Sequence, residues 1–481
     1  MLKTSTMGTV FLMASKEIKN MARQRTLWTL LGVVIGLMLL GLYTGHQVYR
    51  QQKLMVDRAS DQKRTEWLEQ GEKHPHIAAH YGTYVFKPKT ILSLFDHGLD
   101  TYTGTSVYLE AHYPHEFMFR PVQGYGGAIR FGELTAALVL QLLLPLLIIF
   151  ITFQSFTKER ETGTLRLLIS QGVSVRSILM GKVVAFTLVG FIVLTPFFIG
   201  LYLLSGEESE NQVITDVGLR TVLLFGIYAL YLFVFTGFSV WVSLKSSSAR
   251  NALLTLLTFW MVTGVIIPKT AANFGETLYP LPSMKAFKEG IHSDIANGMD
   301  GAGSRLEREA RLKEDYLAHY GVTSLDQLPL NFEGVRMQEG EEYSNKVYDA
   351  HNDKLYARFE EQNRIGSLLA FVAPYMAVRN LSMAMAGTDW YSFNDFTAKT
   401  ETYRRNLIRT MNRDMAENSR YGEFFEYKAD EKLWESIEDF RYVSFTAQRA
   451  LSFYRAELLA LTLWVLWILF LMTIPRKIKN L

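Results

Sequence analysis

The sequence predicts an all-α polytopic membrane protein, built from an amphipathic elbow helix plus six transmembrane helices, with a small α/β and a larger mostly helical extracytoplasmic insertion. Three observations predict this fold class. Apolar residues gather in six runs of about 20 residues, the length that a helix needs to cross the roughly 30 Å core of a bilayer. Lys and Arg concentrate in the connections on one side of such a membrane. Two long polar segments interrupt the series, one after the first run and one after the fifth.

An amphipathic segment precedes the first run. Its apolar and basic residues recur on opposite faces of a helix, with Phe11, Ala14, Ile18 and Met21 on one face and Lys16, Lys19 and Arg23 on the other. Such a helix lies in the inner leaflet as an elbow that leads into the first span. A frayed cytoplasmic tail is the alternative interpretation.

The six runs define the spans. They are Leu27 to Val48, Gly132 to Phe156, Ile178 to Leu204, Val217 to Leu244, Ala249 to Pro268 and Ser452 to Ile474. The first run follows basic residues as a secretory signal does, but it is too long for a cleaved signal and lacks a clear small-x-small site. We therefore expect a retained signal anchor.

Prolines and polar residues interrupt the spans. Pro145 and Pro196 predict kinks, which serve either a moving gate or ordinary packing around a bend. Snorkelling to the outer interface accounts for most of the polar groups in or near the spans. These groups are Glu133, Gln141, Arg220, Arg455 and Glu457.

Basic residues orient the chain. They precede the first span, separate the second span from the third and the fourth from the fifth, and follow the sixth, whereas the connection between spans three and four is acidic. The positive-inside rule then puts both termini in the cytoplasm. The predicted organisation is an elbow helix and first span at 1–48, a first extracytoplasmic insertion at 49–131, spans two to five at 132–268, a second extracytoplasmic helical insertion at 269–451, and span six with a basic cytoplasmic tail at 452–481.

The segment Lys158-Glu-Arg-Glu-Thr-Gly-Thr-Leu165, between spans two and three, is the most informative motif. Its first turn is charged, Gly163 interrupts it, and the residues that follow are amphipathic. This pattern is typical of a short helix, here 157–170, that lies at the membrane surface and presents charge to a cytosolic partner. Because the other cytosolic portions are short basic segments, we expect Glu159, Arg160 and Glu161 to face water or that partner.

Together with the elbow helix, the six spans and the turn from Ser170 to Gly181-Lys182, this motif resembles the permease subunits of the type 2 ABC transporter family. The resemblance implies that 157–170 is the coupling helix, which docks on a cytosolic ATPase. The implied ATPase-coupling residues are Lys158, Glu159, Arg160, Glu161, Thr162, Gly163, Thr164 and Leu165.

The resemblance also implies the setting of the protein. It would be a multi-pass protein of the bacterial cytoplasmic (inner) membrane, in contact with membrane lipids. Its partners would be a cytosolic ABC ATPase dimer and a second permease subunit, in a homodimer or a heterodimer. A periplasmic partner is a further possibility that the large insertions raise.

The two insertions resemble a bacterial sub-family with large extracytoplasmic insertions of unknown function. The phrases that carry this likeness are Ala78 to Gly82, Leu109 to His112, Tyr279 to Ser283 and Leu381 to Asp389. Short strands are expected at Thr83 to Phe86 and Ser106 to Leu109, and packed helices in the second insertion. The segment Leu368 to Met385 is too interrupted for a seventh span and is expected at the outer membrane interface.

Composition excludes several classes of function. A net charge of +3 over 481 residues gives no reason to expect nucleic acid as a partner. Zero cysteines exclude disulfides, thiolate metal sites and a Cys nucleophile. No Gly-x-x-x-x-Gly-Lys-Ser/Thr loop occurs, and the nearest candidate, Gly181-Lys182, lacks the leading glycine. We therefore expect no catalytic residue and no cofactor in this chain, with ATP and Mg bound by the partner ATPase.

Histidines cluster in the first insertion. Seven of the ten lie between His46 and His115. Clustered imidazoles can bind zinc or copper, and the candidate ligands are His74, His76, His80, His112 and His115. No compact motif such as His-Glu-x-x-His appears, so the sequence favours ordinary hydrogen bonding over a metal site.

The sequence therefore predicts the membrane-spanning permease subunit of an ABC transporter, which we expect to be an exporter driven by a separate ATPase. Two alternatives stay open. One is a mechanotransmitting or metal-site maturation subunit that acts on a periplasmic partner, and the other is a membrane-embedded metalloenzyme built on the histidines. The cargo, the direction of transport and the role of the two insertions are not fixed by the sequence.

Overall fold

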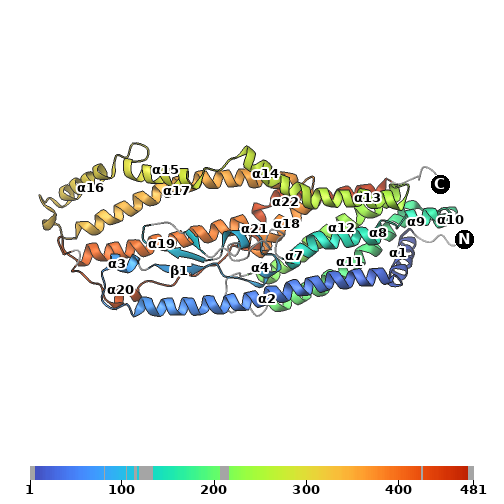
Figure 1. Cartoon of the computed structure of the whole chain (residues 1–481), viewed down its shortest axis with the longest axis horizontal. Coiled ribbons are helices and arrows are strands. Elements are labelled where there is room, and N and C mark those ends of the chain that lie inside the picture. Colours follow the sequence, from blue (N-terminus) through green and yellow to red (C-terminus); the bar gives the residue numbers. More distant parts are fainter. Residues whose placement is uncertain are drawn as a thin grey trace.

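The computed structural model describes residues 6–80, 82–104, 106–112, 116–118, 134–205, 216–423 and 426–474. Over these residues the molecule is mostly helical and elongated (Figure 1). One end is a bundle of membrane-spanning helices. The other, which we call the distal body, consists of the described residues of 49–118 and 279–443. His115, Glu133 and the basic tail after residue 474 lie outside the described residues.

Six helices among the described residues are long and apolar enough to cross a membrane, as predicted. They are α2 (Arg25–Leu68); the series α7 (Ala136–Leu138), η2 (Val139–Leu143), α8 (Leu144–Thr152) and α9 (Thr157–Glu161); α11 (Val175–Ser205); α12 (Val217–Lys245); the series α13 (Ala249–Met261), η4 (Val262–Ile266) and α14 (Ile267–Leu278); and α22 (Arg455–Thr473). The helix α2 runs 20 residues past the predicted end of its span at residue 48. No glycine or proline lies between residues 49 and 68, so nothing in the sequence ends the helix where it becomes polar.

Two spans contain a π-helical turn directly before a proline. The turn η2 precedes Pro145, and η4 precedes Pro268. The wider turn makes room for the proline ring. It also accommodates the loss of the helix hydrogen bond that proline cannot donate, because proline has no backbone N–H. Pro196 lies inside α11, which continues through it.

The elbow helix is α1 (Thr6–Ala22), and it packs along α11. The two helices approach closely at Gly181, where an added Cβ would lie 2.5 Å from the Cβ of Met13. Ala14 of the predicted apolar face is buried in this contact, whereas Phe11 is exposed where lipid would cover it. The elbow is thus packed on the bundle and is not a frayed tail.

Two short helices close the distal end of the bundle. The helix α4 (Ile91–Phe95) is wholly buried, and Phe95 packs edge-on against Tyr228 of α12. The helix α18 (Pro374–Ala386) lies between α12 and α22 with nearly all of its residues buried. This segment does not span, as expected, and it packs among the helices at the distal end of the bundle.

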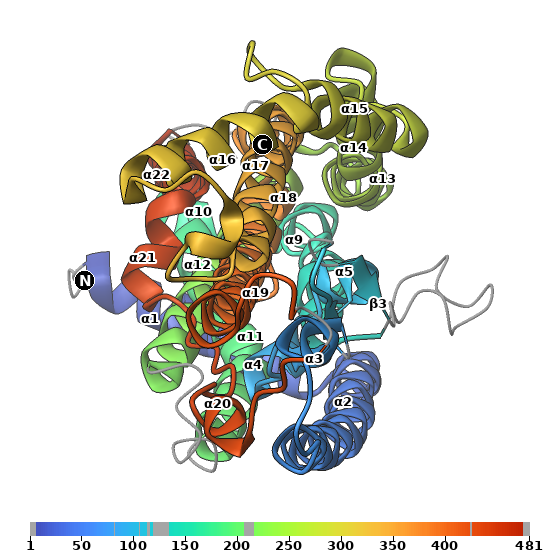
Figure 2. The ribbon, with the colours of Figure 1, turned by 90° about the vertical axis from the view of Figure 1, so that its left-hand side faces the viewer.

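Long helices run along the length of the distal body. The outer half of α2 lies along one side, and α17 (Phe332–Leu369) packs antiparallel to α19 (Trp390–Asn418) (Figures 1 and 2). The remaining helices outside the bundle are α3 (Pro75–His80), α5 (Asp100–Thr103), α10 (Thr164–Ser170), α15 (Met284–Asn297), α16 (Arg305–Tyr320), η5 (Leu325–Gln327), α20 (Glu431–Glu435) and α21 (Ala447–Phe453).

A small antiparallel sheet lies against α19. Its strands β1 (Thr83–Phe86), β2 (Ser106–Leu109) and β3 (Glu116–Met118) are in sequence order, and Thr83 is paired with Leu109. The first two strands are at the predicted positions. Val85, Val107 and Leu109 turn toward α19 and pack with Phe396, because alternate residues of a strand share one face.

The expectation that Arg220 snorkels is wrong. Its side chain is 1% exposed. Nη1 donates to the carbonyls of Ala384 and Met385, each at 3.1 Å, at the end of α18. Nη2 donates to the carbonyl of Phe445, and Nε donates to Asp216 at 2.8 Å. Burial is possible because the guanidinium finds an acceptor for each of its nitrogens.

Glu457 of α22 is also buried, against expectation. Its Oε1 accepts hydrogen bonds from Ser367 Oγ at 2.5 Å and Asn380 Nδ2 at 3.0 Å. These bonds join α22 to α17 and α18. Polar residues at the distal end of the bundle therefore connect the membrane helices to the distal body.

Candidate functional site

The predicted coupling segment folds as two short helices joined at a glycine. The helix α9 ends at Glu161, and α10 runs from Thr164 to Ser170. Gly163 between them has φ of 75°, a left-handed conformation that side chains with a Cβ resist. An added Cβ would meet no atom within 4 Å, so the backbone conformation, and not space, requires glycine here.

The carboxylate of Glu159 faces inward. Its Oε1 accepts from Lys16 Nζ of α1 at 2.7 Å and lies 3.2 Å from Lys182 Nζ of α11. Lys182, only 2% exposed at its side chain, also donates to Glu17 Oε1 of α1 at 2.5 Å. Four charged side chains from three helices thus form one cluster, which we call the proximal ion cluster: Lys16, Glu17, Glu159 and Lys182.

Arg160 also faces inward. Its Nη2 donates to the carbonyl of Leu244 at 2.7 Å, and its Nη1 donates to the carbonyl of Ser246. These carbonyls end α12, where the last turn of a helix leaves its acceptors without intrahelical partners. The expectation that Glu159 and Arg160 face water or a partner is therefore wrong, because tertiary packing brings their partners from elsewhere in the chain.

The opposite face of the segment is exposed. Lys158, Glu161 and Thr162 point away from the bundle, as do Arg166 and Leu167 of α10. Leu167 is 57% exposed, whereas Leu165 of the same helix is fully buried and anchors it. We call Lys158, Glu161, Thr162, Arg166 and Leu167 the outward coupling face; it offers both charge signs around one apolar side chain.

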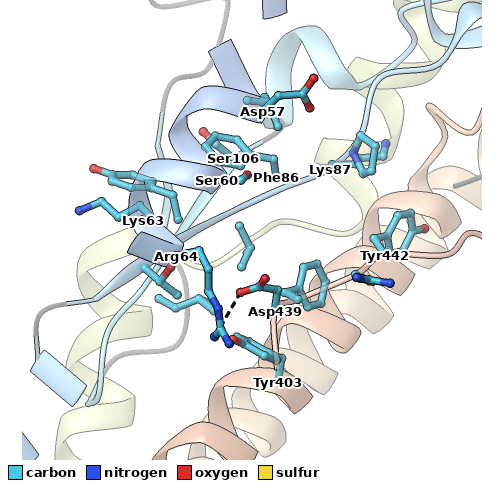
Figure 3. Close-up of a pocket in the computed structure, with 18 of the residues that line it drawn as sticks. Asp57, Ser60, Lys63, Arg64, Phe86, Lys87, Ser106, Tyr403, Asp439 and Tyr442 are labelled. Carbon is cyan, nitrogen blue, oxygen red and sulfur yellow. Dashed lines mark ion pairs between the residues drawn. The ribbon is translucent and has the colours of Figure 1, made fainter. Parts of the chain in front are cut away.

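A cavity of about 1000 Å³ lies in the distal body. Its walls are the outer half of α2, strands β1 and β2, α19 and residues 437–443 (Figure 3). Arg64 of α2 is one of the residues that line this cavity. Its side chain donates to the carbonyl of Ile437 at 2.7 Å and lies 3.6 Å from Asp439. Tyr403 donates to the carbonyl of Glu438, and burial raises the pKa of its hydroxyl to about 12.

The lining of this cavity mixes aromatic rings with charges of both signs. Lys87 and Lys89 pair with the buried Asp100, at 2.6 and 3.2 Å, and fix one wall. Phe86 and Tyr442 contribute rings. Such a lining suits an amphipathic ligand. The sequence could not predict the cavity because its walls join residues 49–110 to residues 403–443, more than 290 positions away in the chain.

The structure brings together three of the five histidine candidates. His76 and His80 of α3 and His112 after β2 have ligand atoms within 4.8 Å of one another. Burial and the neighbouring imidazoles lower the pKa of His76 to about 4. A hydrogen bond with Glu341 raises the pKa of His112. His74 lies beside this group but its Nδ1 accepts from the backbone N–H of His76.

Comparison with known families gives a match for each of two parts of the chain. Residues 91–278 match the model of the ABC-2 family transporter proteins, and residues 287–443 match a domain of unknown function (DUF3526). The first match spans α4 to α14, with the coupling segment inside it, and the second begins in α15 and covers most of the distal helices. No curated protein matches the chain.

Proposed function

We propose, from the premise that the membrane region of this chain is that of an ABC-2 type permease, that the protein is the membrane subunit of an exporter driven by a separate cytosolic ABC ATPase dimer. The chain itself would contribute no catalytic residue and no cofactor, and ATP and Mg would bind to the ATPase. The observation that carries the proposal is the two-sided coupling segment. One side is joined to the bundle and the other is free to receive a partner.

The inward side explains how force would pass into the membrane. Glu159 connects α9 to α1 and α11, and Arg160 connects it to the end of α12. A displacement of α9 and α10 by the ATPase would therefore move three helices together. Packed helices held by such contacts shift as units and do not deform continuously.

The second permease subunit would cover apolar surface that one chain leaves open. The most apolar window of the fifth span is only 17% buried, and that of the first span 28%. Lipid and a second subunit, identical or different, are the partners that fit such faces. An ABC-2 permease is expected to work as a pair.

The orientation follows the basic residues. The proximal end, with α1, α9 and α10, would lie in the cytoplasm of a bacterium, both termini would be cytoplasmic, and the distal body would be periplasmic. Because the chain contains no cysteine, single cysteines can report on this directly. In intact cells a membrane-impermeant thiol reagent should label Ser304→Cys on the distal body and spare Ser247→Cys after α12; labelling of position 247 would overturn the orientation.

The test of coupling reverses charges on the outward coupling face. Glu161→Lys with Arg166→Glu should leave the bundle folded and weaken both pull-down of the ATPase and its turnover in reconstituted membranes. Truncating buried charged partners at an interface typically costs about 2 to 5 kcal/mol. The matched control swaps Lys285 and Glu289, an exposed pair on α15 that is 3.7 Å apart. Unchanged association and turnover in the first variant would remove the proposal.

Mechanotransmission is the second candidate. The continuous helix α2 passes from the bundle into the distal body, where it lines the cavity that a periplasmic partner or its ligand could use. In this case the ATPase would move the distal body and nothing would cross the membrane. Stimulation of ATP hydrolysis by a cargo in proteoliposomes that contain no other protein would count against it.

A further inference from the structure

Three imidazoles converge on one point of the distal body. His76 and His80 are one helical turn apart on α3, so both rings leave the same face of the helix. Their Nε2 atoms are 3.1 Å apart. Tetrahedral zinc with bonds of 2.0 to 2.1 Å holds two nitrogen ligands about 3.3 Å apart. The first two ligands are therefore already at the separation that a metal ion requires.

The third imidazole comes from a different element. His112 follows β2, and its ring centre lies 4.7 Å from that of His80 and 5.3 Å from that of His76. All three ligand atoms are within 4.8 Å of one another. His80 and His112 are exposed, and an ion would have to bring the third nitrogen from at most 4.8 Å to about 3.3 Å from the other two.

We propose that His76, His80 and His112 form a binding site for a divalent transition metal ion, with zinc as the ion that three neutral imidazoles fit. The site faces the solvent side of the distal body. Three protein ligands leave the fourth position of a tetrahedral ion for water or for a group on another molecule. The proposal does not depend on the cargo of the transporter.

A carboxylate supports the third ligand. Nδ1 of His112 shares a hydrogen bond of 2.5 Å with Glu341 Oε1 of α17, which leaves Nε2 for the metal. Carboxylates in this position orient metal-binding imidazoles and make them more basic. Glu341 is itself near the buried Arg404, whose Nη1 lies 3.9 Å from Oε2.

The segments that carry the ligands are fixed before any ion binds. Arg404 of α19 donates to the carbonyl of Ala111, the residue before His112, at 2.6 Å. Ala111 and Ala79 of α3 are both buried in one apolar cluster beside Trp434. Since α3 and the segment after β2 rest on the same cluster, the two segments that carry the ligands keep their relative positions.

The proposed site lies where the two insertions of the chain meet. His76 and His80 belong to the first insertion, and Glu341 belongs to the region that matches the domain of unknown function. The metal would thus join α3 to His112, which its hydrogen bond with Glu341 already connects to α17. Its open position would present a Lewis acid on the surface of the distal body.

The experiment measures zinc binding to the untagged full-length protein in detergent after removal of metal by a chelator. We expect one zinc ion per chain in competition with a chromophoric chelator, and X-ray absorption should show three imidazole nitrogens at about 2.0 to 2.1 Å. His80→Gln with His112→Gln should abolish stoichiometric binding. The matched control, His292→Gln with His319→Gln on α15 and α16, should bind as the wild type does.

A third variant guards against a folding defect. Glu341→Gln keeps all three ligands and should lower the zinc affinity by about 10-fold to 100-fold. Retention of the wild-type elution volume and helix content would show that each variant is folded. Less than one ion per chain in the wild type, or equal affinity in the wild type and the folded double variant, would overturn the proposal.

Discussion

Each end of the bundle buries a positively charged side chain, and the two ends provide different acceptors for its hydrogen bonds. At the proximal end Lys182 lies between the carboxylates of Glu17 and Glu159. At the distal end Arg220 donates mainly to backbone carbonyls, with one carboxylate, Asp216. A lysine is a compact charge that can serve several carboxylates, whereas the planar guanidinium fits fixed acceptors in several directions.

The difference indicates what each end does. The distal arginine binds the end of α18 and the chain before α21, and so holds both segments on α12. The proximal ion cluster contains only side chains, and it joins the elbow, the coupling segment and α11. Side-chain pairs can rearrange without breaking a helix, so the proximal end is the one suited to movement.

The largest effect is expected for Arg220→Met. The substitution removes the donor that three carbonyls share with one oxygen of Asp216, although the other Asp216 oxygen keeps its hydrogen bond from the N–H of Ala447. Breaking a buried charge pair costs about 3 to 5 kcal/mol, and we expect a loss of that size in the free energy of unfolding. Unfolding of the purified protein in mild detergent with increasing dodecyl sulfate measures it.

The control for this variant is Arg449→Met. Arg449 is exposed on α21 and lies 4.8 Å from the ring of Phe453, so its loss should change stability little. An equal shift for the two variants would mean that the distal arginine does not hold α18 and the segment before α21 in place.

A smaller loss of stability is expected for Lys182→Met. The carboxylates of Glu17 and Glu159 would then face each other without the shared cation, although Glu159 keeps its bond from Lys16. Hydrogen bonds to charged groups contribute about 1.5 to 3 kcal/mol, and the free energy of unfolding should fall by that amount. The same detergent titration measures it, together with ATPase turnover in reconstituted membranes.

The control for Lys182→Met is Glu161→Gln, on the outward coupling face of α9, the helix that also carries Glu159. It should leave the unfolding transition unchanged and affect only association with the ATPase. If Lys182→Met left both the unfolding transition and turnover unchanged, the proximal ion cluster would have no part in joining the coupling segment to the bundle.

The parts of the fold that the sequence predicts are those set by local pattern. Runs of about 20 apolar residues suffice to identify the spans, because the bilayer fixes the length of a crossing helix. The strands Thr83–Phe86 and Ser106–Leu109 follow from their composition and are confirmed. The left-handed backbone at Gly163 agrees with the break that the sequence indicates.

The parts that sequence reasoning missed depend on distant partners. Arg220 is buried because carbonyls more than 160 residues away converge on it, and backbone carbonyls have no signature in a sequence. The sequence predicts Glu159 at the surface because its partners are distant in the chain. These partners lie on α1 and α11, and only the packed bundle brings them near Glu159. The histidines lack a compact motif because two of them precede β1 and the third, His112, follows β2; the antiparallel pairing of Thr83 with Leu109 brings the two segments to the same end of the strands.

The smallest effect is expected at Gly163, where the two faces of the coupling segment meet. Gly163→Ala forces a Cβ into the left-handed region, which costs roughly 1 to 2 kcal/mol for residues other than glycine. No neighbouring atom would clash with this Cβ, so the whole cost is conformational. It should be relieved by a change in the angle between α9 and α10, which would rotate Leu167 and Arg166 relative to the proximal ion cluster. We expect weaker coupling of ATP hydrolysis with nearly unchanged stability, measured as turnover in reconstituted membranes and by the detergent titration.

Gly163→Asn is the matched variant, since asparagine tolerates the left-handed region better than alanine. Turnover should therefore decrease in the order glycine, asparagine, alanine; equal turnover in all three would show that the outward coupling face works without a fixed angle to the inward contacts.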